Sequence, residues 1–177
     1  SFWMASLWPA LGIELQCVSI IGDDLPRLTE DFKNGMERSD IIFTTGGLGP
    51  TQDDLTREAI AAAFDETPVI QQEVVDKLER YFAARGTPMP QHNLKQANLI
   101  PSAKWVVNNN GTAPGWWAER DGKIIICMPG PPGENHSMWE EQVEPELAKL
   151  IEDEVTITRN IKTMGMSEGA VDEVISE

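Results

Sequence analysis

The chain alternates short apolar runs with amphipathic stretches, a pattern typical of proteins in which strands and helices alternate. Two runs predict strands: Ile13–Ile21 alternates apolar and polar residues, and Ile41–Thr45 is a continuous β-branched run that suits a strand buried on both faces. The stretches at about Leu25–Met36 and Leu55–Phe64 have helical periodicity and follow these strands. This order favours an α/β fold built on a mostly parallel sheet.

The rest of the chain continues this alternation, and the Asp121-Gly122 pair between two apolar runs is a strong hairpin signal. The pattern changes after Asp153, which suggests the opening of another unit. We therefore expect a main domain over residues 1–153 and the beginning of a small α/β subdomain over residues 154–177. The further predicted strands are Trp105–Val107, Trp116–Glu119, Lys123–Met128 and Val155–Thr163, and the further predicted helices are Phe2–Leu11, Val69–Ala84, a stretch from about Asn135 that restarts at Pro145, and Ser167–Ser176.

The charge balance excludes several classes of function. The chain carries 14 Lys and Arg against 29 Asp and Glu, a formal net charge of −15. Nucleic-acid and anionic-lipid surfaces need clustered Lys and Arg, so we expect neither kind of partner. No apolar run approaches the roughly 18 residues that a membrane-spanning helix requires.

The few histidines and cysteines limit the kinds of metal site and disulfide that the chain can form. His92 and His136 are the only histidines, which excludes a His-rich metal site, so any metal would be held by carboxylates. Cys17 and Cys127 lie in separate apolar segments and form no CxxC pair. This arrangement predicts two buried free thiols in a reducing compartment and therefore a cytoplasmic protein.

The segment Thr44–Thr56 carries the most informative motif, Thr-Thr-Gly-Gly-Leu-Gly-Pro-Thr-Gln-Asp-Asp-Leu-Thr. Glycines between a strand and a helix let successive backbone N–H groups gather around a phosphate. Where a P-loop would end in Lys and Ser or Thr, this loop ends in Asp53 and Asp54. Carboxylates repel phosphate, so they suggest a bridging divalent cation, a ribose hydroxyl or an activated water. Alternatively, Asp54 caps the next helix and Asp53 is solvated.

Two more loops, each after a predicted strand, offer small or rigid residues. Asn110–Gly115 could approach a ligand closely or form a plain tight turn, and Glu134 could contact a ligand or only stabilise a helix start. Asp23 follows the predicted strand Ile13–Ile21 at the same expected edge. Because ligands of open α/β sheets bind outside the carboxyl ends of the strands, we expect these loops to converge there.

The motif at Thr44–Thr56 resembles the signature of the molybdopterin-binding domain superfamily, and its Leu-Gly-Pro-Thr-x-Asp-Asp form is typical of the competence/damage-inducible CinA family. Similar motifs fall in the same order at Lys95–Ala97, Asn110–Gly115 and Pro129–Glu134. The resemblance covers about residues 1–165. Relative to the family, the usual first strand and its Gly-x-Glu-Leu-Leu loop are missing before the helix that opens at Phe2.

The resemblance implies a three-layer α/β/α sandwich, usually homo-oligomeric. For the CinA amino-terminal region it implies a metal-dependent hydrolase that splits ADP-ribose into AMP and ribose 5-phosphate, with Mg²⁺, Mn²⁺ or Co²⁺ as the cation. One alternative is molybdopterin binding or adenylyl transfer in molybdenum cofactor biosynthesis. Another is a non-catalytic module that binds a nucleotide or a pterin.

Carried over by position, the resemblance implies a catalytic role for Asp54 and Asp23, while Asp54 and Asp53 are the candidate metal ligands. The other candidate residues share a place in the three loops and would bind substrate. They are Thr45, Gly46, Gly47, Leu48, Gly49, Thr51, Asn110, Gly111, Thr112, Ala113, Gly115, Gly130, Pro131, Pro132 and Glu134.

Overall fold

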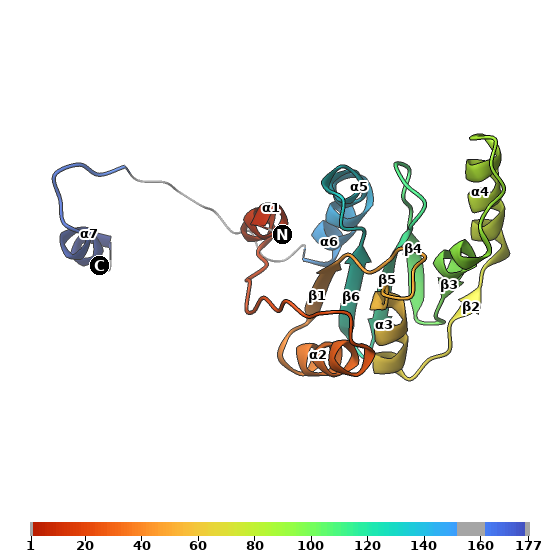
Figure 1. The fold of residues 1–177 in the computed structure, drawn as a ribbon. Helices are drawn as coiled ribbons and strands as arrows, with labels where there is room; N and C mark the ends of the chain where they lie inside the picture. The colour runs from red at the N-terminus through yellow and green to blue at the C-terminus, as the bar shows by residue number, and fades with distance from the viewer. Residues whose placement is uncertain (1, 152–161, 176–177) are drawn as a thin grey trace.

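The computed structural model describes residues 2–151 and 162–175, and its centre is a four-stranded sheet in the order β1-β6-β5-β4 (Figure 1). The α/β class expected from the sequence is confirmed. Within these four strands the pairing is mixed, since β1 and β6 run parallel while β4–β5 and β5–β6 are antiparallel. The strands are β1 (Ile41–Thr45), β4 (Ala103–Val106), β5 (Gly115–Arg120) and β6 (Lys123–Met128).

One face of the sheet is covered by α2 (Leu25–Arg38) and α3 (Thr56–Phe64). Side chains alternate between the faces of a strand, so Ile125 and Cys127 of β6 point into this core. They pack there with Phe64 of α3, and all three side chains are almost fully buried.

The opposite face carries the amino-terminal and the later helices, which makes the architecture three-layered as expected (Figure 1). Ile126 of β6 and Trp117 of β5 point into this second core, against Met4 and Trp139. Pro145 falls near the start of the last of these helices, the position where a proline is tolerated. The elements on this face are α1 (Phe2–Leu7), the 3₁₀ turn η1 (Trp8–Leu11), α5 (Pro132–Met138), the π-helical turn η3 (Trp139–Val143) and α6 (Glu144–Leu150).

A smaller unit extends the molecule beyond β4. Val74, Val75 and Leu78 of the amphipathic helix α4 pack on Ala97, beside a two-stranded antiparallel sheet. The region predicted as a single helix over 69–84 therefore begins with a short strand. The elements are β2 (Val69–Ile70), α4 (Gln72–Ala83), the 3₁₀ helix η2 (Gln91–Ala97) and β3 (Asn98–Leu99).

Local signals in the sequence located several elements well. Gly12 ends the first helical segment in the left-handed conformation, with φ at 72°. Asp121 and Gly122 take φ values of 52° and 75°, the two positive angles that a two-residue type I′ hairpin requires. The hairpin sets Arg120 opposite Lys123, and this register places every inward side chain of β5 and β6.

The strand predicted at Ile13–Ile21 is wrong. These residues form no helix or strand, and Val18 and Ile20 are 71% and 97% exposed. A strand needs a neighbour that accepts its hydrogen bonds, and β1 bonds only to β6 in the described part of the chain. For the same reason β1 lies at the edge of the sheet, where its residues contact both cores but remain half-exposed rather than fully buried.

Towards the carboxyl end, α7 (Glu168–Ile175) confirms the predicted helix at Ser167–Ser176. The strand predicted at Val155–Thr163 falls largely on residues outside those described, as does the division at residue 153. None of the described helices has the length and apolarity that crossing a membrane would require.

The two cysteines differ in a way the sequence did not predict, because Cys17 is exposed whereas Cys127 is completely buried. Burial raises the pKa of the Cys127 thiol to about 11, which suppresses its reactive thiolate form. We expect one thiol to react at once with a chromogenic disulfide reagent. The second should react on the order of 1,000-fold more slowly or slower, because it requires global unfolding.

The reaction is followed by absorbance, and the modified peptide is identified by mass spectrometry. Cys17→Ser should remove the fast phase and leave the slow one. Two thiols of equal reactivity would contradict the burial of Cys127 or the exposure of Cys17.

Candidate functional site

The three loops singled out in the sequence meet at one edge of the sheet. Thr45, the last residue of β1, pairs with Met128, the last residue of β6, so the two loops leave side by side. The backbone N–H of Gly46 donates to the Met128 carbonyl at 2.9 Å and fixes the start of the first loop. At the same edge β4 ends opposite the beginning of β5, where Val106 pairs with Gly115, so the third loop also emerges there.

The first loop turns back on itself through two left-handed glycines, Gly46 with φ at 92° and Gly47 with φ at 65°. Thr56, the first residue of α3, closes the turn from the far side. Its hydroxyl donates to the Gly46 carbonyl at 2.8 Å, and its backbone N–H donates to the Gly47 carbonyl at 3.2 Å. The loop therefore lies against the amino-terminal end of a nine-residue helix, where partial positive charge favours an anion.

Asp54 folds back to brace the loop that contains it. Its Oδ2 accepts the Thr51 backbone N–H at 2.9 Å and the Thr51 hydroxyl at 2.6 Å. Burial by itself would raise the pKa of Asp54, but the hydrogen bonds from Thr51 and from the Gly49 backbone, together with the charge of Lys95, outweigh it and lower the pKa. Asp54 is therefore a carboxylate at neutral pH.

Gly49 makes room for this carboxylate, because a Cβ at this position would lie only 2.5 Å from Asp54 Oδ2. The expected alternative for Asp54, a cap on the following helix, is not what the structure shows: Leu55 precedes α3 and makes no side-chain cap hydrogen bond. Asp53, the second candidate metal ligand, is exposed as expected for a solvated side chain.

The second and third loops are joined to each other by side chains. Asn108 Nδ2 donates to the Glu134 carboxylate at 2.5 Å and to the Ala113 carbonyl at 3.0 Å. The Asn110 side chain adds a bond of 3.3 Å to the Gly133 carbonyl. A Cβ on Gly111 would overlap the Glu134 carboxylate, so this glycine permits the close approach of the two loops.

The other predicted substrate-binding residues divide by exposure. Leu48, Ala113 and Gly115 are buried in the protein, and a Cβ on Gly115 would collide with the Cys127 carbonyl, so the packing alone explains these three. Seven other candidate residues are exposed or partly exposed where the loops meet, and their contact with a ligand stays a prediction. They are Thr45, Thr51, Asn110, Thr112, Gly130, Pro131 and Pro132.

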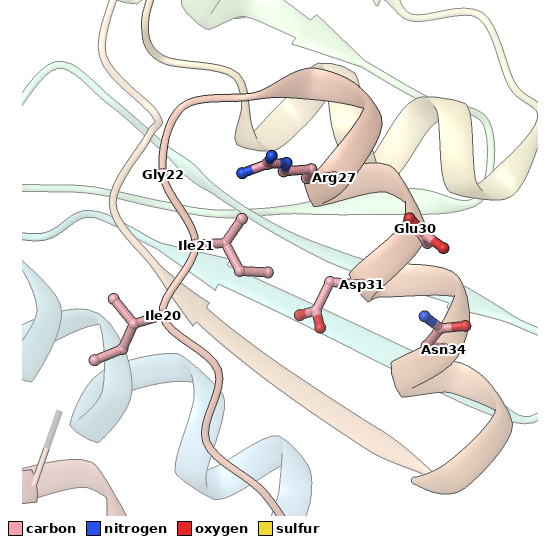
Figure 2. A pocket seen from close by; sticks show the side chains of 7 residues that line it. All are labelled: Ile20, Ile21, Gly22, Arg27, Glu30, Asp31 and Asn34. Carbon is pink, nitrogen blue, oxygen red and sulfur yellow. The ribbon is translucent and has the colours of Figure 1, made fainter.

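Asp23 lies apart from the contacts that join the three loops. It is exposed in the turn before α2, and its neighbour Asp24 caps that helix by accepting the Arg27 N–H at 3.0 Å. An open hollow of about 330 Å³ adjoins this turn. Figure 2 shows its lining, in which Ile20, Ile21 and Gly22 of the extended segment face Arg27, Glu30, Asp31 and Asn34 of α2.

The acidic side chains described at this site are too few to hold a metal by themselves. Among residues 2–151 and 162–175, no three His, Cys, Asp or Glu side chains are grouped so that they could hold an ion. Asp54 and the exposed Asp53 offer carboxylate oxygens from adjacent positions. This sparse donor set suits Mg²⁺, which is commonly held by one or two carboxylates plus water and substrate phosphates.

Sequence reasoning from local pattern missed the residues that hold the loops in place. Lys95 Nζ reaches across from η2 to the carbonyls of Thr51, at 2.9 Å, and Asp54, and it pairs with Glu58 at 3.1 Å. Arg57 is buried between two of the loops. The motif at Lys95 was noted only as part of the resemblance to a family, with no role assigned, and Arg57 gave no signal beyond a charge in an alanine-rich helix.

Comparison with protein families matches residues 1–149 to the family described as "Probable molybdopterin binding domain". A CinA-like protein of Thermomicrobium roseum is 45% identical over 95% of the chain, and one of Deinococcus radiodurans is 44% identical over 94%. The chain spans only 41% and 42% of the lengths of these two relatives.

Solved structures give the same picture of the fold. CinA of Thermoplasma acidophilum, described as of unknown function, is similar with a TM-score of 0.76 and 27% identity, over 82% of this chain and 85% of that one. A molybdopterin biosynthesis protein of Mycobacterium abscessus shares the fold at 16% identity, with a TM-score of 0.53 over 85% of this chain and 81% of its own.

Proposed function

Because the chain belongs to the family described as "Probable molybdopterin binding domain", we propose that its three-loop edge binds a phosphate-bearing small molecule. We propose further that the reaction is hydrolysis of the diphosphate of ADP-ribose, as in a CinA-type pyrophosphatase. Water adds to one phosphorus, the bridging P–O bond breaks, and the products are AMP and ribose 5-phosphate.

The observation that supports this proposal most is the combination of a glycine turn with an ionised carboxylate. Gly46 and Gly47 turn the chain so that the loop lies at the start of α3. Backbone N–H groups there can hold phosphate oxygens and stabilise the charge that builds on them during the reaction. Asp54, held as a carboxylate by its own loop, lies at the end of the same turn.

A divalent cation completes the proposal, because a phosphate and a bare carboxylate repel each other. Asp54, together with the exposed Asp53, would hold the cation, and the substrate phosphates and water would supply the other ligands. When bound, Mg²⁺, Mn²⁺ or Co²⁺ would neutralise phosphate charge and lower the pKa of the attacking water. The protein residues then have three tasks: to hold the carboxylate, to orient the phosphates and to fix the loop spacing.

The family description favours a second candidate function, which is binding of a pterin or adenylyl transfer to it. The same loop edge would then hold the phosphate of the pterin. The chemistry differs in the acceptor, since ATP would transfer AMP to the pterin phosphate and release pyrophosphate.

The proposal is tested by incubating the protein with ADP-ribose and each of the three cations, and by quantifying AMP chromatographically. AMP that appears only with protein and metal would support the hydrolase. Absence of AMP would refute it. Parallel reactions with ATP and molybdopterin test adenylyl transfer, and calorimetry with ADP-ribose distinguishes a binding module, which would give tight binding without product.

A further inference from the structure

Arg57 is a buried guanidinium that bridges two of the three loops. Its side chain comes from the first turn of α3 and the residue is only 2% exposed. Nη1 donates to the Leu48 carbonyl at 2.8 Å, and Nη2 donates to the Pro114 carbonyl at 2.6 Å. One planar fork therefore holds two carbonyls that lie 66 positions apart in sequence (114 − 48), one in the glycine loop and one in the loop before β5.

Arg57 forms no direct ion pair with any described residue. Burial lowers the pKa of its guanidinium, and the carboxylates of Glu58 and Asp54 only partly offset that cost. Its Nε has no hydrogen-bond partner among the described residues, and the guanidinium lies 5.9 Å from the centre of the Trp116 ring. Burying a cation is costly even where carboxylates lie nearby, and well-packed apolar residues often serve stability as well or better. Stability alone therefore does not account for an arginine at this position.

A second side chain, that of Gln96, also connects the same two loops. Gln96 Nε2 lies 3.4 Å from the Leu48 carbonyl and 3.4 Å from the Thr112 hydroxyl, which makes a second, longer bridge. The residue before Arg57 is Thr56, whose hydroxyl binds the Gly46 carbonyl. The first turn of α3 thus holds the glycine loop through three hydrogen bonds, two from Thr56 and one from Arg57, and joins it to the loop before β5.

We propose that Arg57 is a positioning residue whose fork sets the spacing between loop 46–54 and loop 108–114, and whose buried charge favours anionic ligands between them. The second half of this inference rests on the proposed function. The geometry is specific to arginine, because a planar guanidinium donates in two fixed directions whereas the ammonium of lysine is a point charge on a flexible stem.

The test compares Arg57→Lys, which keeps the charge but loses the fork, with Arg57→Met, which loses both. Val143→Ala is the matched control, because Val143 is fully buried in the core on the other face, a cluster that includes no residue of either loop. Each variant is characterised by urea unfolding. Hydrogen–deuterium exchange is then measured by mass spectrometry without ligand, and binding of ADP-ribose and inorganic pyrophosphate with Mg²⁺ is measured by calorimetry.

We expect Arg57→Lys to raise exchange about 10-fold or more in both loops together, while Val143→Ala leaves both loops unchanged at a comparable loss of stability. Affinity for both probes should fall about 10-fold in Arg57→Lys and further in Arg57→Met. Unchanged exchange in the two loops, or a rise equal to that in Val143→Ala, would overturn the positioning role. Unchanged affinity in Arg57→Met would overturn the electrostatic role.

The two proposals fail separately in this design. Wild-type protein that binds neither probe would refute the proposed ligand class and with it the electrostatic half of the inference. The exchange data would still decide whether Arg57 holds the loops. If Arg57→Met does not fold, Arg57→Lys still decides the positioning role, and Arg57→Gln, which is neutral but keeps a side-chain donor, replaces Arg57→Met in the affinity comparison.

Discussion

Asp54→Asn is expected to lower kcat/KM for ADP-ribose hydrolysis by at least about 100-fold, the effect typical of losing a catalytic carboxylate. The substitution removes charge but preserves shape. The two groups that face Oδ2, the Thr51 N–H and hydroxyl, are both donors, so the remaining carbonyl oxygen of an asparagine can accept them. The loop should therefore persist while the charge that attracts the cation is lost. AMP formation at several Mg²⁺ concentrations measures the effect.

The control is Asp121→Asn, which makes the same chemical change in the β5–β6 turn at the other edge of the sheet. Asn-Gly is as favourable there as Asp-Gly, so activity and melting temperature should not change. Wild-type activity in Asp54→Asn would exclude the proposed mechanism.

The pH dependence of the wild type follows from the lowered pKa of Asp54. Its charged form, and any stability that this form contributes, is complete above the unfolded-state pKa of about 3.9 and is lost as pH falls through the lower folded-state pKa. Loss of activity due to this group is therefore expected only below about pH 4. A pH–rate profile with an Asp54 limb near neutrality would contradict the hydrogen bonds that Thr51 donates to Asp54.

Gly47→Ala is expected to destabilise the protein by about 2–5 kcal/mol and to abolish measurable binding of ADP-ribose. Two costs add: about 1–2 kcal/mol for alanine at the left-handed φ of 65°, and about 1–3 kcal/mol for overpacking. The new methyl group would overlap the Thr56 hydroxyl and lie 3.2 Å from Thr56 Cβ, so the first turn of α3 must shift. Urea unfolding and calorimetry measure the two effects.

A second substitution separates the two costs. Thr56→Ala removes the overlapping hydroxyl, so the Gly47→Ala/Thr56→Ala double variant should be more stable than the sum of the two single changes predicts. Simple additivity would show that backbone strain alone is responsible. Gly169→Ala, in α7 where a Cβ meets nothing, should leave binding unchanged and should not lower stability, because alanine favours a helix more than glycine does.

The sequence predicts the elements that depend on local signals. The Asp121-Gly122 hairpin and the glycine turn at Gly46 and Gly47 need particular backbone angles, and only a few residue types adopt them. The convergence of the three loops follows from the same reasoning, since strand ends at one edge bring their loops together. The class of the fold and the convergence of the three loops could therefore be predicted.

The rest depends on neighbours that a local pattern does not specify. Ile13–Ile21 has the alternation of a strand, but in the described part of the chain no strand accepts its hydrogen bonds. Arginine is usually a surface residue, yet Arg57 is buried, because two carbonyls that are distant in sequence accept hydrogen bonds from it. Such contacts join residues far apart in sequence, and the hydrophobic periodicity of a segment does not predict them.

The exposed edge of β1 also bears on how the protein behaves at high concentration. In the described part of the chain the outer side of β1 pairs with no strand, and such a row of unpaired backbone groups is a template on which other chains can add strands. With a net charge of −15, two copies repel one another at low ionic strength. Salt shortens the range of that repulsion to about 10 Å at 0.1 M, so colloidal stability should fall as salt is added.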